Sequence, residues 1–190
     1  MARWACLGGV LLLALRHDTA VLTQDRIIAS NGESQNMRSP FQGKAISYAA
    51  FSFGKYRLYA PIEGLTGLVE FSPAEYATMG RQFEGEKNYN ASPVTFLGRS
   101  WKLMLGTVHG KIYKIAPYLT LKTKQEANPV AMEILRYCTE KLGKPASQET
   151  GLFTWDTTDG NVILQTAETA EGLAINLFLT SRAVRGFKRR

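Results

Sequence analysis

Cysteine and histidine are scarce in this sequence, and their scarcity excludes several kinds of chemical site. The two cysteines are Cys6, in an apolar N-terminal run, and Cys138, within a predicted helix. The two histidines, His17 and His109, are far apart in the chain. Neither a disulfide framework nor the paired spacing of a zinc site is present. We therefore predict no metal ion and no cofactor.

A long apolar run is also missing. The run from Trp4 to Leu15 is too short to span a bilayer, so we predict no transmembrane span. Its length suits the core of a signal peptide, but a cut after Ala20 would place Asp18 where a small residue is expected. Residues 1–20 are therefore a possible signal peptide of an exported, periplasmic protein, an uncleaved anchor, or a mis-assigned start. In the last case Met37 is the true start and the protein is cytoplasmic.

The familiar catalytic motifs are absent as well. The stretch "GLTGLVEF" has two glycines and no following lysine, so it is not a phosphate-binding loop. No serine lies in the context of a nucleophile elbow. Among the closely spaced acids, Glu75 is explained by helix capping, and Glu70 lies between apolar residues as an outward-facing strand residue does. We predict that the protein is not an enzyme, and an unrecognised hydrolase is the alternative in that class.

The chain does have the composition of a globular domain. It has 190 residues, of which 45% are hydrophobic and 21% are charged, as in an ordinary folded domain. Residues 21–44 are polar without a clear period, which predicts a linker. We expect one α+β domain over residues 45–182 and a basic tail over residues 183–190.

Two helices are predicted from their capping residues. Ser72, Pro73 and Glu75 form a capping box at the start of a short helix that ends near residues 81–85. Asn128 and Pro129 predict the start of a second, longer helix.

The second helix has a clear apolar side. Gly143 is predicted to end this helix, and Pro145 lies just beyond it. Its apolar residues recur at helical spacing, which predicts that this side packs on a sheet. They are Ala131, Ile134, Leu135, Cys138 and Leu142.

The stretch "TWDTTDGNVILQ" could be a metal loop, a catalytic pair or a turn. Asp156 and Asp159 lack the alternate spacing of a calcium loop. Asp159 and Gly160 instead predict a hairpin turn, in which Gly160 has a positive φ and Asp159 accepts bonds from nearby backbone amides. Trp155 then belongs to a strand, where it is either packed in the core or displayed beside the turn.

Each predicted helix is followed by three strand-like stretches. We infer a tandem helix–strand–strand–strand repeat with units at about 72–125 and 128–182. The predicted fold class is α+β, with an antiparallel sheet of six or more strands and two helices on one face.

A family resemblance rests on four stretches. They are "FSPAEY", "GKIYKI", "NPVAMEILRYCTEKLGKP" and "FTWDTTDGNVILQ". In this order they resemble the small bacterial exported domains of the beta-lactamase-inhibitor-protein type and of the small outer-membrane-assembly lipoprotein type, over residues 62–180. The resemblance implies protein-binding or envelope roles and carries over no catalytic residues. Cys6 is not set in a lipobox.

Positive charge is concentrated in two segments of this chain, whose formal net charge is +7. Residues 99–124 and 182–190 are rich in Lys and Arg and contain no acid. Such asymmetry predicts a basic face for an anionic partner. The candidate binding residues are Lys102, Lys111, Tyr113, Tyr118, Lys122, Lys124 and Trp155.

Two kinds of partner fit these residues. The first prediction is a non-enzymatic interaction module whose sheet binds a protein or an anionic envelope component. The alternative is single-stranded nucleic-acid binding through tyrosine stacking and lysine–phosphate contacts, although no glycine-aromatic string typical of RNA-binding domains is present. A solvated strand face and a mobile tail would give the same charge pattern without any partner, and the oligomeric state is left open.

Overall fold

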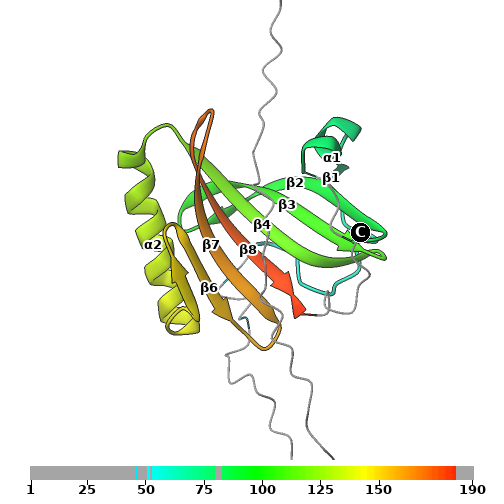
Figure 1. Ribbon diagram of the computed structural model, residues 1–190. Coiled ribbons are helices and arrows are strands. Elements are labelled where there is room, and N and C mark those ends of the chain that lie inside the picture. The colour runs from blue at the N-terminus through cyan, green and yellow to red at the C-terminus, as the bar shows by residue number, and fades with distance from the viewer. Residues whose placement is uncertain (1–45, 47–50, 52, 80–82, 183–190) are drawn as a thin grey trace, which may run out of the picture.

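The structure, a computed structural model, describes residues 46, 51, 53–79 and 83–182 (Figure 1). The predicted leader, the linker, the Met37 start and the tail from residue 183 lie outside the described residues. No helix in the described ranges is long and apolar enough to cross a membrane.

The described residues form eight strands and two helices. In chain order they are β1 (Leu68–Glu70), α1 (Pro73–Met79), β2 (Glu86–Phe96), β3 (Arg99–Val108), β4 (Lys111–Leu121), α2 (Lys124–Leu142), β5 (Ser147–Glu149), β6 (Leu152–Asp156), β7 (Gly160–Thr169) and β8 (Gly172–Ser181). The strands make one antiparallel sheet in the order β1-β2-β3-β4-β8-β7-β6-β5. The predicted antiparallel sheet is confirmed, and β4 pairs with β8 at its centre.

Two tight turns fix the register of the first three long strands. Leu97-Gly98 joins β2 to β3, and His109-Gly110 joins β3 to β4. All four residues have a positive φ between 48° and 72°, as two-residue hairpin turns of type I′ require.

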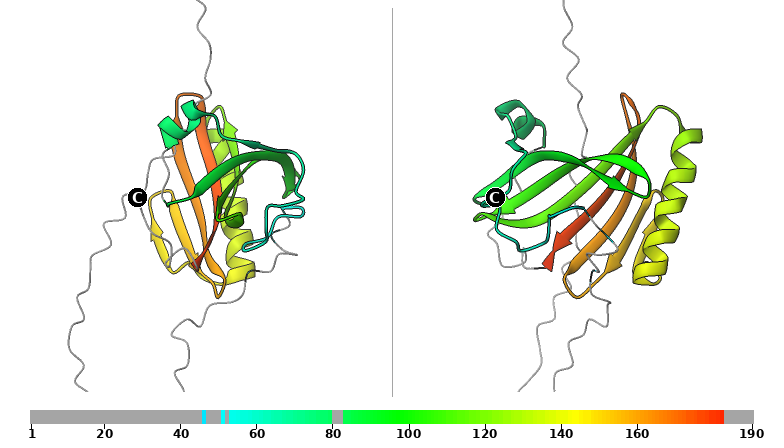
Figure 2. Two further views of the ribbon diagram at one scale, coloured as in Figure 1. Left: turned by 90° about the vertical axis from the view of Figure 1, so that its right-hand side faces the viewer. Right: turned by 180° about the vertical axis from the view of Figure 1, so that it is seen from behind.

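The two helices lie on opposite faces of the sheet. Alternation along β3 directs Leu103 and Leu105 to one face and Met104 to the other. The cluster that contains Leu103 and Leu105 also contains Ile134 of α2, whereas Met104 clusters with Tyr76 of α1. Figures 1 and 2 show the two helices far apart, at opposite ends of the sheet.

The predicted α+β fold class with both helices on one face is therefore wrong. The described chain is mostly one antiparallel sheet, with α2 on one face and α1 against the other. The physical reason is that Phe71 and Tyr76 pack against Met104 on one face, whereas Ile134 of α2 packs with the apolar residues of the other face. The seven residues of α1 also span only about 10 Å and none is buried, so this helix covers little of its face.

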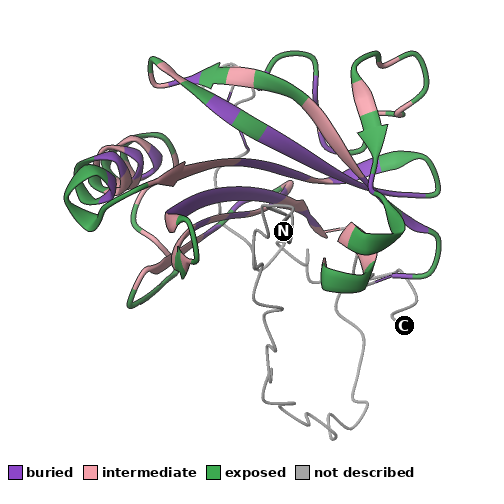
Figure 3. Ribbon diagram, turned by 90° about the horizontal axis from the view of Figure 1, so that it is seen from above, coloured by how far each residue is buried: buried purple, intermediate pink, exposed green. Residues whose placement is uncertain are grey.

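We call the face that contacts α2 the inner face, and the face that carries Met104 and Ala116 the outer face. A chain segment before β1 completes the inner-face core together with α2, through Phe51, Phe53 and Leu58. Figure 3 shows buried residues along the strands and on one side of α2. The inner face is thus covered by α2 and by this segment.

Helix α2 begins earlier than the sequence predicts. Thr123, not Asn128, is its N-cap, and the Thr123 side chain accepts a 3.2 Å hydrogen bond from the Glu126 amide. Pro129 therefore lies inside the helix, where it lacks an N–H for the carbonyl four residues earlier. Gly143 ends the helix as predicted, and its N–H donates to the Thr139 carbonyl at 2.9 Å.

The predicted apolar side of α2 does face the sheet. Ile134 and Cys138 are fully buried, and Ala131 and Leu142 are partly buried against the same cluster. The capping box of α1 is also confirmed, because Ser72 N–H donates to Glu75 Oε2 at 2.7 Å and Glu75 N–H donates to Ser72 Oγ at 3.3 Å.

The predicted turn at Asp159-Gly160 joins β6 to β7, but its two residues act differently than expected. Gly160 is not among the residues with a positive φ; a Cβ there would lie 1.7 Å from the Thr180 carbonyl oxygen, so Gly160 permits close approach of β8. Asp159 Oδ2 accepts a 2.7 Å bond from the distant Ile46 amide. Asp159 therefore ties the segment before β1 to the end of the sheet.

Candidate functional site

Two of the predicted binding residues lie side by side. Lys102 on β3 and Tyr118 on β4 are cross-strand partners. The Lys102 ammonium nitrogen is 5.9 Å from the centroid of the Tyr118 ring, within the range of a cation–π contact. Both belong to the outer face, since Lys102 is two residues before Met104 and Tyr118 is two after Ala116.

The other lysines do not join this pair. Lys111 lies seven residues from Tyr118 on β4, a separation of about 23 Å along a strand. Lys124 makes a 2.5 Å ion pair with Glu168. Lys122 is exposed in the connection between β4 and α2.

The two other predicted aromatic residues are buried. Tyr113 is 4% exposed, and its hydroxyl donates to a carboxylate. Trp155 is 1% exposed, and its indole N–H donates a 2.9 Å bond to the Gly143 carbonyl at the end of α2. Trp155 therefore joins α2 to β6 and presents no ring to a partner.

The Lys102–Tyr118 pair continues into a row of polar side chains, which we call the outer-face row. Tyr118 is the cross-strand partner of Asn176 on β8, and Asn176 is the partner of Gln165 on β7. The row therefore crosses four adjacent strands, a width of about 14 Å. Lys102 is exposed, Tyr118 and Gln165 are half-buried, and Asn176 is buried.

The electrostatic setting of the row is mixed. Burial raises the pKa of Tyr118, and the nearby carboxylates Glu75 and Glu171 add to the increase. The ammonium of Lys102 is thus the positive end of a row that has acids at its margin.

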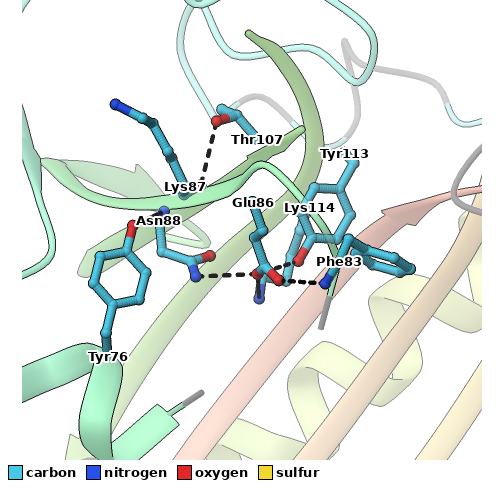
Figure 4. Close-up of polar contacts among 8 residues, drawn as sticks. All are labelled: Tyr76, Phe83, Glu86, Lys87, Asn88, Thr107, Tyr113 and Lys114. Carbon is cyan, nitrogen blue, oxygen red and sulfur yellow. Dashed lines mark hydrogen bonds and ion pairs between the residues drawn. The ribbon is translucent and has the colours of Figure 1, made fainter. Parts of the chain in front are cut away.

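A second, buried polar cluster lies on the same face and was missed by sequence reasoning (Figure 4). Its centre is Glu86, which is 2% exposed. Glu86 Oε1 accepts a 2.6 Å bond from the Tyr113 hydroxyl and a 3.0 Å bond from Asn88 Nδ2. Glu86 Oε2 accepts a 3.1 Å bond from the Phe83 amide, and Lys114 Nζ lies 4.0 Å from Oε1. We call these residues the Glu86 cluster.

A register shift between β3 and β4 builds this cluster. Gly106 pairs with Lys114, but the next residue, Thr107, pairs with Ile112, so Tyr113 is an extra residue on β4. Such an irregularity re-aims a side chain. Tyr113 and Lys114 therefore both reach across Gly106, where an added Cβ would lie 2.8 Å from Tyr113 Cε1 and 2.9 Å from Lys114 Cε. Gly106 is the residue that leaves room for both.

Burial shifts the pKa values of two titratable groups in the cluster. Burial lowers the pKa of Lys114, and Glu86 partly opposes this effect. Burial also raises the pKa of Tyr113, and the carboxylate of Glu86 raises it further. Asn88 is 2% exposed, and its Oδ1 has no hydrogen-bond partner among the described residues. The Asn88 N–H donates to the Tyr76 hydroxyl at 2.8 Å, which connects α1 to the cluster.

A sequence signal for the cluster does exist. Ile112 and Ile115 both belong to the inner-face core, although they are three residues apart. Regular alternation would separate inner-face residues by two, so the spacing in "KIYKI" indicates an irregular strand.

Comparisons with family models, curated proteins and solved structures found no match for this chain. The resemblance to exported inhibitor-type domains therefore stays a prediction. Within the described ranges, no three His, Cys, Asp or Glu side chains converge as metal ligands would.

Proposed function

We propose that this protein is a non-catalytic binding module, and that the outer-face row binds an extended protein segment that carries carboxylates. The observation that carries the proposal is the cross-strand alignment of Lys102, Tyr118, Asn176 and Gln165 on the face opposite α2. The row offers three side chains that reach solvent, those of Lys102, Tyr118 and Gln165, at one level of the sheet, with the buried Asn176 between Tyr118 and Gln165.

The chemistry of the row suits a peptide. The exposed Lys102 ammonium can pair with a carboxylate, and the Tyr118 ring offers an apolar surface with a polar tip. The amide of Gln165 can both donate and accept, which matches the N–H and C=O groups of a peptide backbone. A width of about 14 Å corresponds to about four residues of an extended chain.

One feature favours a protein over single-stranded nucleic acid. A stacking platform needs several open aromatic rings, but the rings of Tyr113 and Trp155 are buried.

Site-directed photo-crosslinking tests the proposal. A benzophenone amino acid replaces Gln165 in the row or, as a control, Met132, which is 61% exposed on α2. We expect the Gln165 variant, in the cells that make the protein, to form a crosslink to one acidic protein, and the Met132 variant not to form it. Adding Tyr118→Ala should remove the Gln165 crosslink. The same crosslinks from both positions would contradict the proposal.

Fluorescence anisotropy with a single-stranded oligonucleotide tests the alternative. We expect weak binding that disappears near physiological salt and is unchanged by Tyr118→Ala, because only long-range attraction would remain. A loss of about 1–3 kcal/mol on Tyr118→Ala, the usual contribution of one stacked base, would favour nucleic-acid binding instead.

The exported location of the protein is a prediction from the sequence of residues 1–20. N-terminal sequencing of the natural product would show whether the chain begins at residue 1, after residue 20 or at Met37, and would thereby narrow the partner to an envelope or a cytoplasmic protein.

A further inference from the structure

The Glu86 cluster places an amine, a carboxylate and a phenol within reach of one another. Lys114 Nζ lies 4.0 Å from Glu86 Oε1, and the Tyr113 hydroxyl lies 2.6 Å from the same oxygen. We propose that the Lys114 amine is a covalent capture site for small aldehydes or ketones, which it binds as an imine. This site is separate from the outer-face row and does not depend on the partner proposed above.

The environment of Lys114 favours this reaction. The unprotonated amine is the nucleophile in imine formation, and burial lowers the pKa of Lys114, so a larger share of it is unprotonated at neutral pH than for an exposed lysine. A part of its side chain, 13%, is exposed to solvent.

The reaction balances without an added oxidant or reductant. The amine nitrogen forms a double bond to the carbonyl carbon and gives up its two protons, and the carbonyl oxygen leaves with them as water. Glu86 is the group that can carry protons from nitrogen to oxygen, because its Oε1 lies 4.0 Å from the amine and already accepts a hydrogen bond from the Tyr113 hydroxyl.

Three features of the chain hold Lys114, Glu86 and Tyr113 in this arrangement: the register shift, Gly106 and Asn88. The register shift directs both Tyr113 and Lys114 across Gly106, whose missing side chain leaves their path open. Asn88, which donates to the same Glu86 oxygen, keeps a buried Oδ1 without a partner among the described residues. That oxygen can accept a hydrogen bond from an O–H or N–H of a bound compound.

Lys102 supplies a matched internal control. It lies on the same face, and its ammonium is 5.9 Å from the Tyr118 ring centroid, as that of Lys114 is 5.5 Å from the Tyr113 ring centroid. Lys102 differs in being exposed and in making no ion pair with a carboxylate of the described residues, whereas Lys114 lies beside Glu86. A difference in reactivity between the two lysines therefore reports on the Glu86 cluster.

Reductive labelling with benzaldehyde and cyanoborohydride at pH 7, followed by peptide mass mapping, tests the proposal on the full chain. We expect Lys114 to be modified before Lys102 in the folded protein, and the two to be modified at equal rates in denaturant. Lys114→Arg, which keeps the charge but not the nucleophile, should lose the dominant adduct and keep the melting temperature of the wild type within a few degrees.

Three results would overturn the proposal. They are modification of Lys114 no faster than that of Lys102 in the folded chain, the same preference for Lys114 in the denatured chain, and a dominant adduct that persists in Lys114→Arg.

Discussion

Tyr113 and Glu86 are 27 residues apart in sequence, and the Tyr113 hydroxyl donates a 2.6 Å hydrogen bond to the buried Glu86 carboxylate. Tyr113→Phe should lower the free energy of unfolding by about 1.5–3 kcal/mol, since the bond is made to a buried carboxylate that would lose a donor. Urea unfolding measures the loss. Tyr118→Phe, on the outer face, is the matched control and should change stability by less than about 0.5 kcal/mol. Equal losses in the two variants would show that the Tyr113 hydroxyl contributes nothing specific.

The lowered pKa of Lys114 predicts a dependence of stability on pH. In the unfolded chain this lysine has an ordinary pKa of 10.5, so between its lowered folded value and 10.5 the unfolded state binds more protons. Stability contributed by this site must therefore rise with pH through that window.

Lys114→Arg isolates this contribution, because arginine stays charged throughout. The unfolding free energy of the wild type minus that of Lys114→Arg, measured by urea melts from pH 7 to pH 10, should increase with pH. A constant or falling difference would mean that Lys114 is not desolvated.

Replacing Gly106 or Gly160 by alanine should lower the stability of the fold by different amounts, because the added Cβ meets different atoms. In Gly106→Ala the Cβ meets Tyr113 and Lys114 side-chain atoms, which can shift, so we expect a loss of about 1–3 kcal/mol. In Gly160→Ala the Cβ meets the Thr180 backbone at 1.7 Å, which cannot move without separating β7 from β8. Thermal melts should therefore rank Gly160→Ala as the less stable variant, and the reverse order would contradict the described packing.

The packing of α2 predicts a contrast along one helix. Ile134 is fully buried, so Ile134→Ala should cost about 2–5 kcal/mol. Met132 is 61% exposed, so Met132→Ala should stay within about 0.5 kcal/mol. Leu142 is half-buried, and Leu142→Ala should fall between the two. Denaturant melts that give Ile134→Ala and Met132→Ala the same cost would place the wrong side of α2 on the sheet.

Local features of the fold could be predicted from the sequence, because their causes lie within a few residues. The capping box of Ser72 and Glu75 and the turn at Asp159-Gly160 are examples. The start of α2 was misplaced because two caps compete: Asn128-Pro129 matches a helix start, but Thr123 with Glu126 three residues later does so as well. Tertiary packing of Ala127, which is fully buried, favours the earlier start.

The sheet face that each helix contacts could not be predicted, because it depends on the path of the chain between elements. Helical spacing shows that α2 has an apolar side. The seven residues of α1 contain no pattern that predicts which face of the sheet this helix contacts. That outcome depends on Phe71 and Tyr76 packing against Met104, a contact across more than 25 residues.

Only part of the candidate site could be predicted, because the sequence indicates residue types whereas the strand register decides which of them lie together. Lys102 and Tyr118 were both identified from charge and aromatic content, and cross-strand register brings them together. The sequence also predicts Tyr113 as a stacking residue. The register shift instead turns Tyr113 toward Glu86, a residue that no local pattern had distinguished.

The affinity of the crosslinked partner for row variants tests the central claim most directly. Calorimetry would compare the wild type with Lys102→Ala, Tyr118→Ala and, as the control, Lys111→Ala, which removes an exposed lysine at the other end of β4. The account predicts that each row variant weakens binding by at least about 1 kcal/mol, as for residues central to an interface, while Lys111→Ala binds like the wild type. Row variants that bind like the wild type, or a Lys111→Ala variant that loses as much as they do, would contradict a binding surface at the outer-face row.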